Sequence, residues 1–324
     1  MATARRYRIS TTLRNAGRRW GFSRQHFIVP RRIRFGTRPK QGSLSMAEML
    51  AAPPAPARRS WPVLATSGHL EARIAQSQAE VAAAQALRYR VFYEEMAAVP
   101  TPEMRAEHRD FDKYDEFCDH MLVRDLSARD ERGNPAVVGT YRLLRGEVAA
   151  LHGGYYTSSE YDIGPMQHAN PPGTRFLELG RSCVLRSYRS QAVTMQLLWK
   201  GIGVYLARYS IDVMFGCGSL PGTDPDALAL PLSYLHHFHR APPERRFRAR
   251  PGLYVEMNRM PKEEIDPKKA LRALPPLIKG YLRAGTYVGD GAVVDRQFGT
   301  TDVLLYSQVR EIDPRVLSRF GSKK

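Results

Sequence analysis

The chain has 324 residues, of which 43% are hydrophobic and 25% charged, a composition that indicates an ordinary globular protein rather than a disordered chain. It lacks any run of roughly 20 apolar residues that would span a bilayer and the compact apolar segment of a secretory signal, so we expect a cytoplasmic location. Three well-separated cysteines without a CxxC spacing suggest neither a disulfide framework nor a zinc site, and we expect reduced, buried side chains at Cys118, Cys183 and Cys217.

The formal net charge of +17 comes mostly from residues 1–40, which hold twelve Arg and Lys side chains and no acidic one. The other 37 basic residues face 32 acidic ones, so the rest of the chain carries only +5. Such a basic segment suits peripheral contact with an anionic membrane face, where each basic residue contributes on the order of 1 kcal/mol, and RNA would attract it too. The plainest interpretation is an unstructured extension, or a stretch that precedes a start at Met46. We expect no nucleic-acid partner.

Residues 51–62, "AAPPAPARRSWP", are rich in proline and alanine and indicate a linker. We therefore predict a basic extension over residues 1–62 and one folded domain over residues 63–324. The domain begins with a short strand-like or polar lead near Leu70. A strong helix is then predicted up to residue 96, with apolar side chains on one side at Val81, Ala84, Leu87 and Val91.

Residues 118–127 and 135–147 are two β-rich runs, and the turn "ARDERGN" between them predicts a hairpin. Residues 175–185, "RFLELGRSCVL", predict a third strand. Residues 192–210 predict a long apolar helix, which places the "GIG" run in mid-helix, where it is not a phosphate-binding loop.

Residues 212–219 predict a fourth strand, and a helix follows from Asp224 or Asp226, either of which is a suitable N-cap. The last third adds the run "YVEMNRM", a helix around "LPPLIKGYLRAG" and a final strand "TDVLLYSQV". This order predicts one mixed α/β domain whose central sheet is covered by helices. We predict no metal site, because no matched carboxylate or cysteine accompanies His236, His237 and His239.

The layout resembles the GNAT-type N-acyltransferases, and within them the branch of L-ornithine N-alpha-acyltransferases and acyl-homoserine-lactone autoinducer synthases. The resemblance covers roughly residues 63–309. It is carried by "LRYRVFYEEM" with Arg88 and Phe92, by "DKYD" with Asp112 and Asp115, by "GTYRLL" with Arg142, and by "ELGR" with Glu178 and Arg181. The runs "GCGSLPGTDPDALALPLSYLHH" and "LPPLIKGYLRAG" are closer to the ornithine branch.

The resemblance implies a GNAT-like fold with a central, mostly antiparallel sheet flanked by helices. It implies transfer of a 3-hydroxy fatty acyl group from acyl carrier protein to the α-amine of L-ornithine, which gives lyso-ornithine lipid. No bound cofactor is implied, since the acyl carrier protein thioester is a co-substrate. Glycine, lysine and homoserine lactone remain open as acceptors, and so does a different class, a catalytically silent basic protein that binds membrane or RNA.

An amine that attacks a thioester must first lose a proton, and a carboxylate near the pocket can accept it. Glu178 is our candidate, because its strand is otherwise apolar and burial would raise its pKa, while Arg181 would oppose too large a shift. The structural alternative is that these two residues form a buried ion pair or face outward on a half-exposed strand.

The resemblance places Arg88, Phe92, Asp112, Asp115 and Arg142 around the substrates. The two acids would bind the cationic groups of ornithine, or would merely solvate a loop. The two arginines would anchor the acceptor carboxylate or order the acidic loop, and their structural alternative is an ordinary salt bridge.

The loop "RSYRSQA" lacks the glycines with which acetyl-CoA-dependent relatives bind a pyrophosphate. We predict a smaller cradle for the single phosphodiester of phosphopantetheine, formed by Arg186, Arg189 and Ser190. Acyl carrier proteins are acidic, and we predict a docking patch at Arg245, Arg246 and Arg248, with a solvated loop as the structural alternative.

Overall fold

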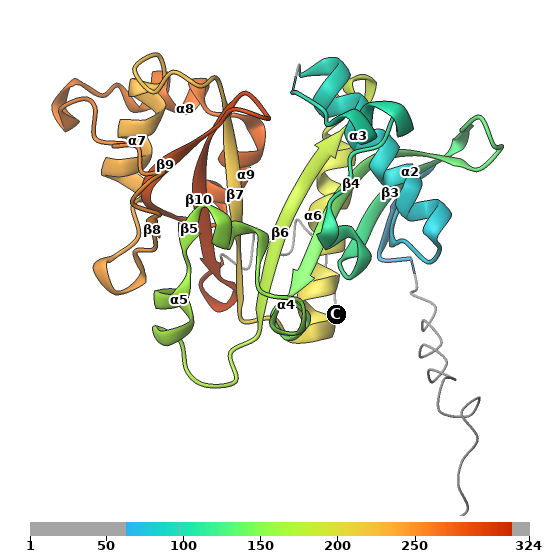
Figure 1. Ribbon diagram of the computed structural model, residues 1–324, viewed down its shortest axis with the longest axis horizontal. Coiled ribbons are helices and arrows are strands. Elements are labelled where there is room, and N and C mark those ends of the chain that lie inside the picture. Colours follow the sequence, from blue (N-terminus) through green and yellow to red (C-terminus); the bar gives the residue numbers. More distant parts are fainter. Residues whose placement is uncertain (1–62, 97, 313–324) are drawn as a thin grey trace, which may run out of the picture. The chain divides into compact units, whose positions relative to one another are not determined.

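A ten-stranded sheet runs through the part of the chain that the computed structural model describes, residues 63–96 and 98–312 (Figure 1). The strand order is β1-β2-β3-β4-β6-β7-β10-β9-β8-β5. The strands are β1 Ala65–Ser67, β2 Leu70–Ile74, β3 Asp119–Arg129, β4 Pro135–Arg145, β5 Tyr161–Asp162, β6 Phe176–Val184, β7 Val213–Pro221, β8 Arg248–Ala249, β9 Tyr287–Asp295 and β10 Thr300–Gln308. Pairing is antiparallel except between β6 and β7 and between β8 and β9, so the predicted mostly antiparallel sheet is confirmed. The extension predicted over residues 1–62 lies outside the described residues.

Helices flank the sheet, as predicted. They are α2 Gln78–Tyr89, α3 Pro102–Glu107, α4 Gly146–Leu151, α5 Gly164–His168, α6 Ala192–Tyr209, α7 Ala229–His239, α8 Pro267–Ala273 and α9 Pro276–Arg283. A π-helical turn, Arg90–Glu95, extends α2 directly. Within the described residues, no helix is both long enough and apolar enough to cross a lipid bilayer.

Alternation along β3 assigns the two faces of the sheet, because successive side chains of a strand point to opposite sides. Met121 and Val123 belong to the large core that contains the buried face of α6. Leu122, between them, packs with Val81 and Ala84 of α2. The helices α6 and α2 therefore cover opposite faces of β3 and β4 (Figure 1).

The predicted hairpin, the third and fourth strands, the long helix with its "GIG" run and the final strand are all confirmed. The predicted caps of α7 are wrong. The helix begins at Ala229 after Leu228, without a side-chain cap. The carboxylate of Asp224 instead accepts the N–H of Asp226 at 2.9 Å, and this local turn precedes the helix.

The run "YVEMNRM" is mostly irregular, and only Val255 pairs, through an isolated bridge to Ala292 of β9. Strand β9 itself was not predicted, since its glycines weaken the strand pattern. Gly291 has a φ of +82°, and a Cβ there would lie 2.4 Å from the ring of Tyr254. Gly291 thus weakens the sequence pattern of β9, and the fold requires a glycine at this position.

Candidate active site

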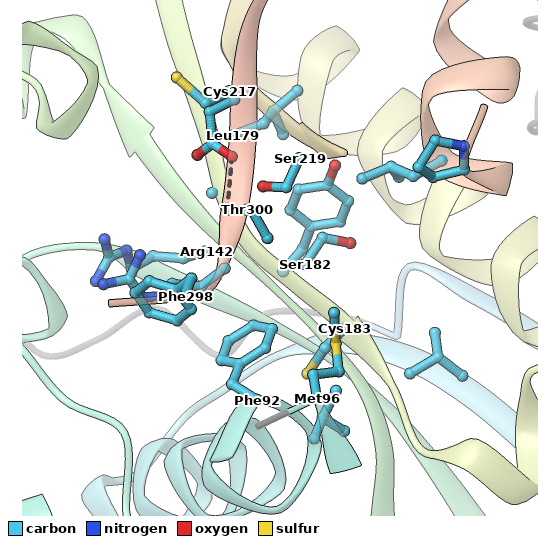
Figure 2. A pocket seen from close by; sticks show the side chains of 18 of the residues that line it. Phe92, Met96, Arg142, Leu179, Ser182, Cys183, Cys217, Ser219, Phe298 and Thr300 are labelled. Atoms are coloured by element: carbon cyan, nitrogen blue, oxygen red, sulfur yellow. Dashed lines mark hydrogen bonds between the residues drawn. The ribbon is translucent and has the colours of Figure 1, made fainter. Parts of the chain in front are cut away.

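The sheet opens between β6 and β7. These parallel strands pair at only three positions, from Phe176 with Val213 to Glu178 with Phe215. Beyond that point they separate around a cavity of about 400 Å³. Figure 2 shows Ser182 and Cys183 of β6 and Cys217 and Ser219 of β7 beside this cavity. The backbone of β6 beyond Glu178 therefore has no strand partner on its β7 side.

A β-bulge turns β6 toward the cavity. Pairing with β4 runs from Thr140 with Cys183 to Arg142 with Gly180, so Arg181 and Ser182 together lie opposite a single residue of β4. Arg181 has a φ of +50°, in the left-handed region that few residues other than glycine adopt. Such bulges re-aim side chains and are frequent beside active sites. This explains why the strand predicted around "ELGR" carries polar residues at this place.

Glu178 lines the cavity and is only 5% exposed. Its two carboxylate oxygens accept the backbone N–H groups of Tyr156 at 2.9 Å and Thr157 at 2.6 Å. Burial raises its pKa above the ordinary value of 4.5, although these hydrogen bonds oppose the rise. The carboxylate thus holds the 3₁₀ turn Tyr156–Ser159 in place and also faces the space where substrates would react.

Arg181 also lines the cavity, but its charge is directed elsewhere than we expected. Its guanidinium forms ion pairs with Asp110 at 3.4 Å and Asp112 at 3.2 Å. No ion pair joins it to Glu178 within the described residues. The positive charge that lowers the pKa of Glu178 most is that of Arg142, so Arg142 takes the predicted place of the counter-charge.

Asp115 is buried, and its carboxylate accepts hydrogen bonds from both terminal nitrogens of Arg88, at 3.0 and 2.6 Å. Arg142 lies 3.3 Å from the same carboxylate. Burial alone would raise the pKa of Asp115, but the two arginines hold it below its ordinary value. Arg88 also forms an ion pair with Asp110 at 2.7 Å. Arg88 therefore forms the salt bridge that we weighed as its structural alternative, and its role in ordering the acidic loop stays a prediction.

Asp112 is likewise occupied by arginine. Its carboxylate accepts hydrogen bonds from Arg142 at 2.6 Å and from Arg181 at 3.2 Å. It also caps a 3₁₀ turn by accepting the N–H of Tyr114. Three arginines and three aspartates thus form one network in which the charges balance; we call it the arginine–aspartate network, and its members are Arg88, Arg142, Arg181, Asp110, Asp112 and Asp115.

Of the residues predicted to touch substrates, the structure brings Phe92, Arg142, Glu178 and Arg181 to the cavity wall. Phe92 comes from the π-helical turn and packs edge-on against Phe298. Arg88, Asp112 and Asp115 do not line the cavity; they support Arg142 and Arg181 from behind.

The loop between β6 and α6 carries the predicted phosphopantetheine residues. Arg189 lines the cavity, donates to the carbonyl of Val184 at 2.8 Å and pairs with Glu95. Arg186 and Ser190 are exposed. The following helix, α6, starts at Ala192 without a side-chain cap on its first amides.

The predicted docking residues each have a partner within the chain. Arg245 pairs with Glu311 at 2.8 Å, Arg246 donates to a backbone carbonyl, and Arg248 lies 3.8 Å from Asp290. Glu311 follows the end of β10 that pairs with Val213, whereas the cavity adjoins the other end of β10. Arg245 is therefore separated from the cavity by most of the length of that strand.

Sequence reasoning missed a group of three acidic residues, two of which, Asp295 and Asp302, line the cavity. Glu160, Asp295 and Asp302 each place a carboxylate oxygen within 4.8 Å of the other two. They are far apart in the sequence, and only the pairing of β9 with β10 and the path of the chain before β5 bring them together. The signal available beforehand was an aspartate at the start of an otherwise apolar final strand.

The fold and the site define a class of protein. The profile of the acetyltransferase (GNAT) domain matches residues 87–200, which include the arginine–aspartate network, the bulged strand and the start of α6. The mixed sheet separates at β6 and β7 around a cavity whose wall holds a buried carboxylate. Together with the matching domain, this arrangement assigns the chain to the N-acyltransferases.

Curated relatives narrow this class. The L-ornithine N(alpha)-acyltransferase of Rhizobium meliloti (strain 1021) is 52% identical over 260 residues, which are 80% of this chain and 87% of the relative. That of Agrobacterium fabrum (strain C58 / ATCC 33970) is 48% identical over 79% of this chain and 86% of the relative. The chain belongs to the L-ornithine N(alpha)-acyltransferase family, and the predicted resemblance is confirmed.

A solved structure of the CoA-dependent acyl-homoserine lactone synthase BjaI, with SAM and isopentyl-CoA, is also similar to this chain. The identity is 16%, the TM-score is 0.40, and the match covers 76% of this chain and 84% of the other. A likeness at this level says nothing about donor or acceptor.

Proposed function

We propose that this enzyme transfers a 3-hydroxy fatty acyl group from acyl carrier protein to the α-amine of L-ornithine, with lyso-ornithine lipid as the product. The observation that carries the proposal is the cavity between the separated strands β6 and β7, with the buried carboxylate of Glu178 in its wall. The names of the curated relatives support ornithine as the acceptor.

The lining of the cavity supports a fatty acyl donor. Apolar side chains from several parts of the chain surround it, among them Val91, Phe92, Val184, Met195 and Leu277. An acyl chain that enters this space loses contact with water, which favours binding by about 0.8 kcal/mol for each buried methylene. The wall that holds Glu178 and Arg142 is polar, and we place the thioester there.

The loop before α6 supports a carrier-protein donor. Arg189 at the cavity and the exposed Arg186 bring positive charge to the uncapped start of α6, an arrangement that suits one phosphodiester. We propose that these residues and Ser190 receive phosphopantetheine. The docking surface predicted at Arg245, Arg246 and Arg248 stays a proposal, and its distance from the cavity makes Arg186 and Arg189 the better-placed contacts for the carrier.

The proposed reaction begins when Glu178 takes a proton from the α-ammonium, directly or through one water. The neutral nitrogen attacks the thioester carbonyl carbon, and the carbon–sulfur bond then breaks. A second proton of the nitrogen passes to the departing thiolate, so the products are an amide and the free thiol of the carrier, and Glu178 then releases the first proton to water. Backbone amides of β6 beyond Glu178 that face the β7 side, where no strand pairs with them, are suitable donors to the developing oxyanion.

The test is product analysis by mass spectrometry. Purified enzyme is incubated with a 3-hydroxyacyl carrier protein, or with the same acyl group on CoA, and an equimolar mixture of ornithine, lysine, glycine and homoserine lactone. We expect ornithine acylated at the α-amine, identified by fragmentation, from the carrier-protein donor. A preference for CoA or for another amine would refute that part of the proposal.

A matched pair of variants tests the proton acceptor. Glu178→Gln should lose most turnover, whereas Glu263→Gln, at an exposed position, should keep it. Thermal unfolding of both variants separates lost chemistry from lost structure. Full turnover in a folded Glu178→Gln variant would remove Glu178 from the mechanism.

A further inference from the structure

One wall of the cavity carries a group of carboxylates, and the charge of Arg181 is the positive charge that lowers the pKa of two of them, Glu160 and Asp302, without forming an ion pair. Asp295 ends β9, Asp302 lies in β10, and both line the cavity; Glu160 lies directly beside them. We call these three residues the acidic group. Within residues 63–96 and 98–312 none of the three forms an ion pair with a basic side chain. This contrasts with the arginine–aspartate network, in which every carboxylate faces a guanidinium.

Glu160 is the clearest sign that a ligand is missing from the acidic group. The residue is nine-tenths buried and 9% exposed. One of its carboxylate oxygens accepts the weak thiol donor of Cys217 at 3.2 Å, and the other has no donor among the described residues. Both Asp295 and Asp302 place an oxygen within 4.8 Å of a carboxylate oxygen of Glu160. The oxygen without a donor is not among the buried side-chain atoms that lack a partner, so it stays open to a bound group that donates hydrogen bonds.

The protonation behaviour of the acidic group agrees with this geometry. Burial, followed by the charge of Asp302, raises the pKa of Glu160 to about 7. Burial also raises the pKa of Asp302 above its ordinary value, even though the Thr300 hydroxyl donates to it at 2.9 Å. Like charges in a dry place resist ionisation together, and a bound cation removes that resistance.

We infer that Glu160, Asp295 and Asp302 bind the side-chain ammonium of a diamino-acid acceptor and thereby select it over acceptors with one amine. This inference rests on the proposed function, in which ornithine is the acceptor. The two amines of such an acceptor need opposite environments. The α-amine must give up its proton to attack, whereas the side-chain amine stays charged and gains from carboxylates that form no ion pair with a basic side chain of the described residues.

Norvaline isolates this interaction, because it has the carbon skeleton of ornithine but lacks the side-chain amine. Steady-state kinetics with a fixed concentration of acyl carrier protein thioester give kcat/KM for both acceptors. A charge-assisted contact in a buried site predicts a preference for ornithine of about 10- to 100-fold in the wild type.

The variants Asp302→Asn and Glu160→Gln keep the size of each side chain and remove its charge. Each should bring the preference for ornithine down by about tenfold or more, through a higher KM for ornithine, while turnover of norvaline stays within a few-fold of wild type. The matched control is Asp290→Asn on β9, whose carboxylate pairs with Arg240 at 2.6 Å outside the cavity; it should keep the preference.

The outcomes separate the inference from the function on which it rests. If the wild type acylates no amine, the proposed function fails. If it acylates ornithine and norvaline equally, or if both variants keep the wild-type preference, the inference fails and the function stands. If a variant turns over neither acceptor, calorimetry measures its affinity for ornithine and for norvaline, and the ratio of the two affinities takes the place of the kinetic preference. A preference that disappears with a chelator and returns with Mg²⁺ or Ca²⁺ would assign the acidic group to a metal ion and overturn the inference.

Discussion

The carboxylate of Glu178 has two roles: it holds the turn Tyr156–Ser159 in place, and it is our proposed proton acceptor. Its pKa is raised chiefly by burial, so it becomes protonated at a higher pH than a free glutamate does. Activity should therefore fall as the pH is lowered through that raised pKa. The pH profile of kcat/KM should be measured with norvaline, because norvaline does not use the acidic group. Glu178→Gln should lower turnover by about 10²- to 10⁴-fold and remove this acid limb.

The arginine–aspartate network predicts a large cost in stability for the loss of Arg88. Arg88→Met leaves Asp110 and Asp115 buried without their main cation, which should lower the free energy of unfolding by about 3–5 kcal/mol. Denaturant unfolding measures this loss, and Arg186→Met, at an exposed position, is the control with about 0.5 kcal/mol or less.

The sign of the pH effect gives a second check on Arg88. In the wild type the lowered pKa of Asp115 adds stability above its ordinary pKa of 3.8, and this stability is lost as the pH falls through the folded-state value. Without Arg88 the carboxylate can be protonated at a higher pH. The deficit of the variant should therefore shrink as the medium is acidified, and a deficit independent of pH would contradict this account.

A sequence motif predicted which residues lie at the site, but it did not predict which residues they contact. Glu178, Arg181, Arg142 and Phe92 do line the cavity. The prediction that Asp112 and Asp115 have charge to spare for ornithine remains untested, but both are already paired with arginine. No motif marks the acidic group, because its members meet only after the sheet has assembled.

At the level of the elements, the separation of β6 from β7 depends on a close backbone approach just beyond their last paired residues. A Cβ on Gly216 would lie 2.2 Å from the carbonyl oxygen of Leu179. Gly216→Ala should therefore displace one strand and cost about 1–3 kcal/mol of stability. Gly180→Ala on β6 is the matched control, because a Cβ there meets nothing within 4 Å. Equal melting temperatures for the two variants would show that this approach is not needed.

Periodicity predicted most elements because it reports which side of an element is buried, and α2 and the β3–β4 hairpin show this well. Periodicity could not predict the order of the strands in the sheet. Neither the insertion of β6 between β4 and β7 nor the parallel pairing of β6 with β7 leaves a trace in local sequence, since both depend on contacts across α6. Yet these two features create the cavity.

At the scale of the whole molecule, the uneven distribution of charge leads to a test of the extension. Removal of residues 1–45 takes away all twelve basic residues of the first forty. We expect turnover to be retained and binding to anionic vesicles to weaken, measured by a product assay and by vesicle sedimentation. Loss of turnover in a truncated protein with an unchanged melting temperature would place the extension in the catalytic machinery.

Two cysteines lie on the separated strands, beside the cavity in which we propose that the thioester reacts. Cys183 of β6 and Cys217 of β7 both line the cavity (Figure 2). Burial raises the pKa of Cys183 to about 12 and that of Cys217 well above its ordinary value, so both stay protonated at neutral pH. Exchange between a thiol and a thioester requires the thiolate. In the proposed reaction the acyl group therefore meets two protonated thiols, and neither should take it from the donor.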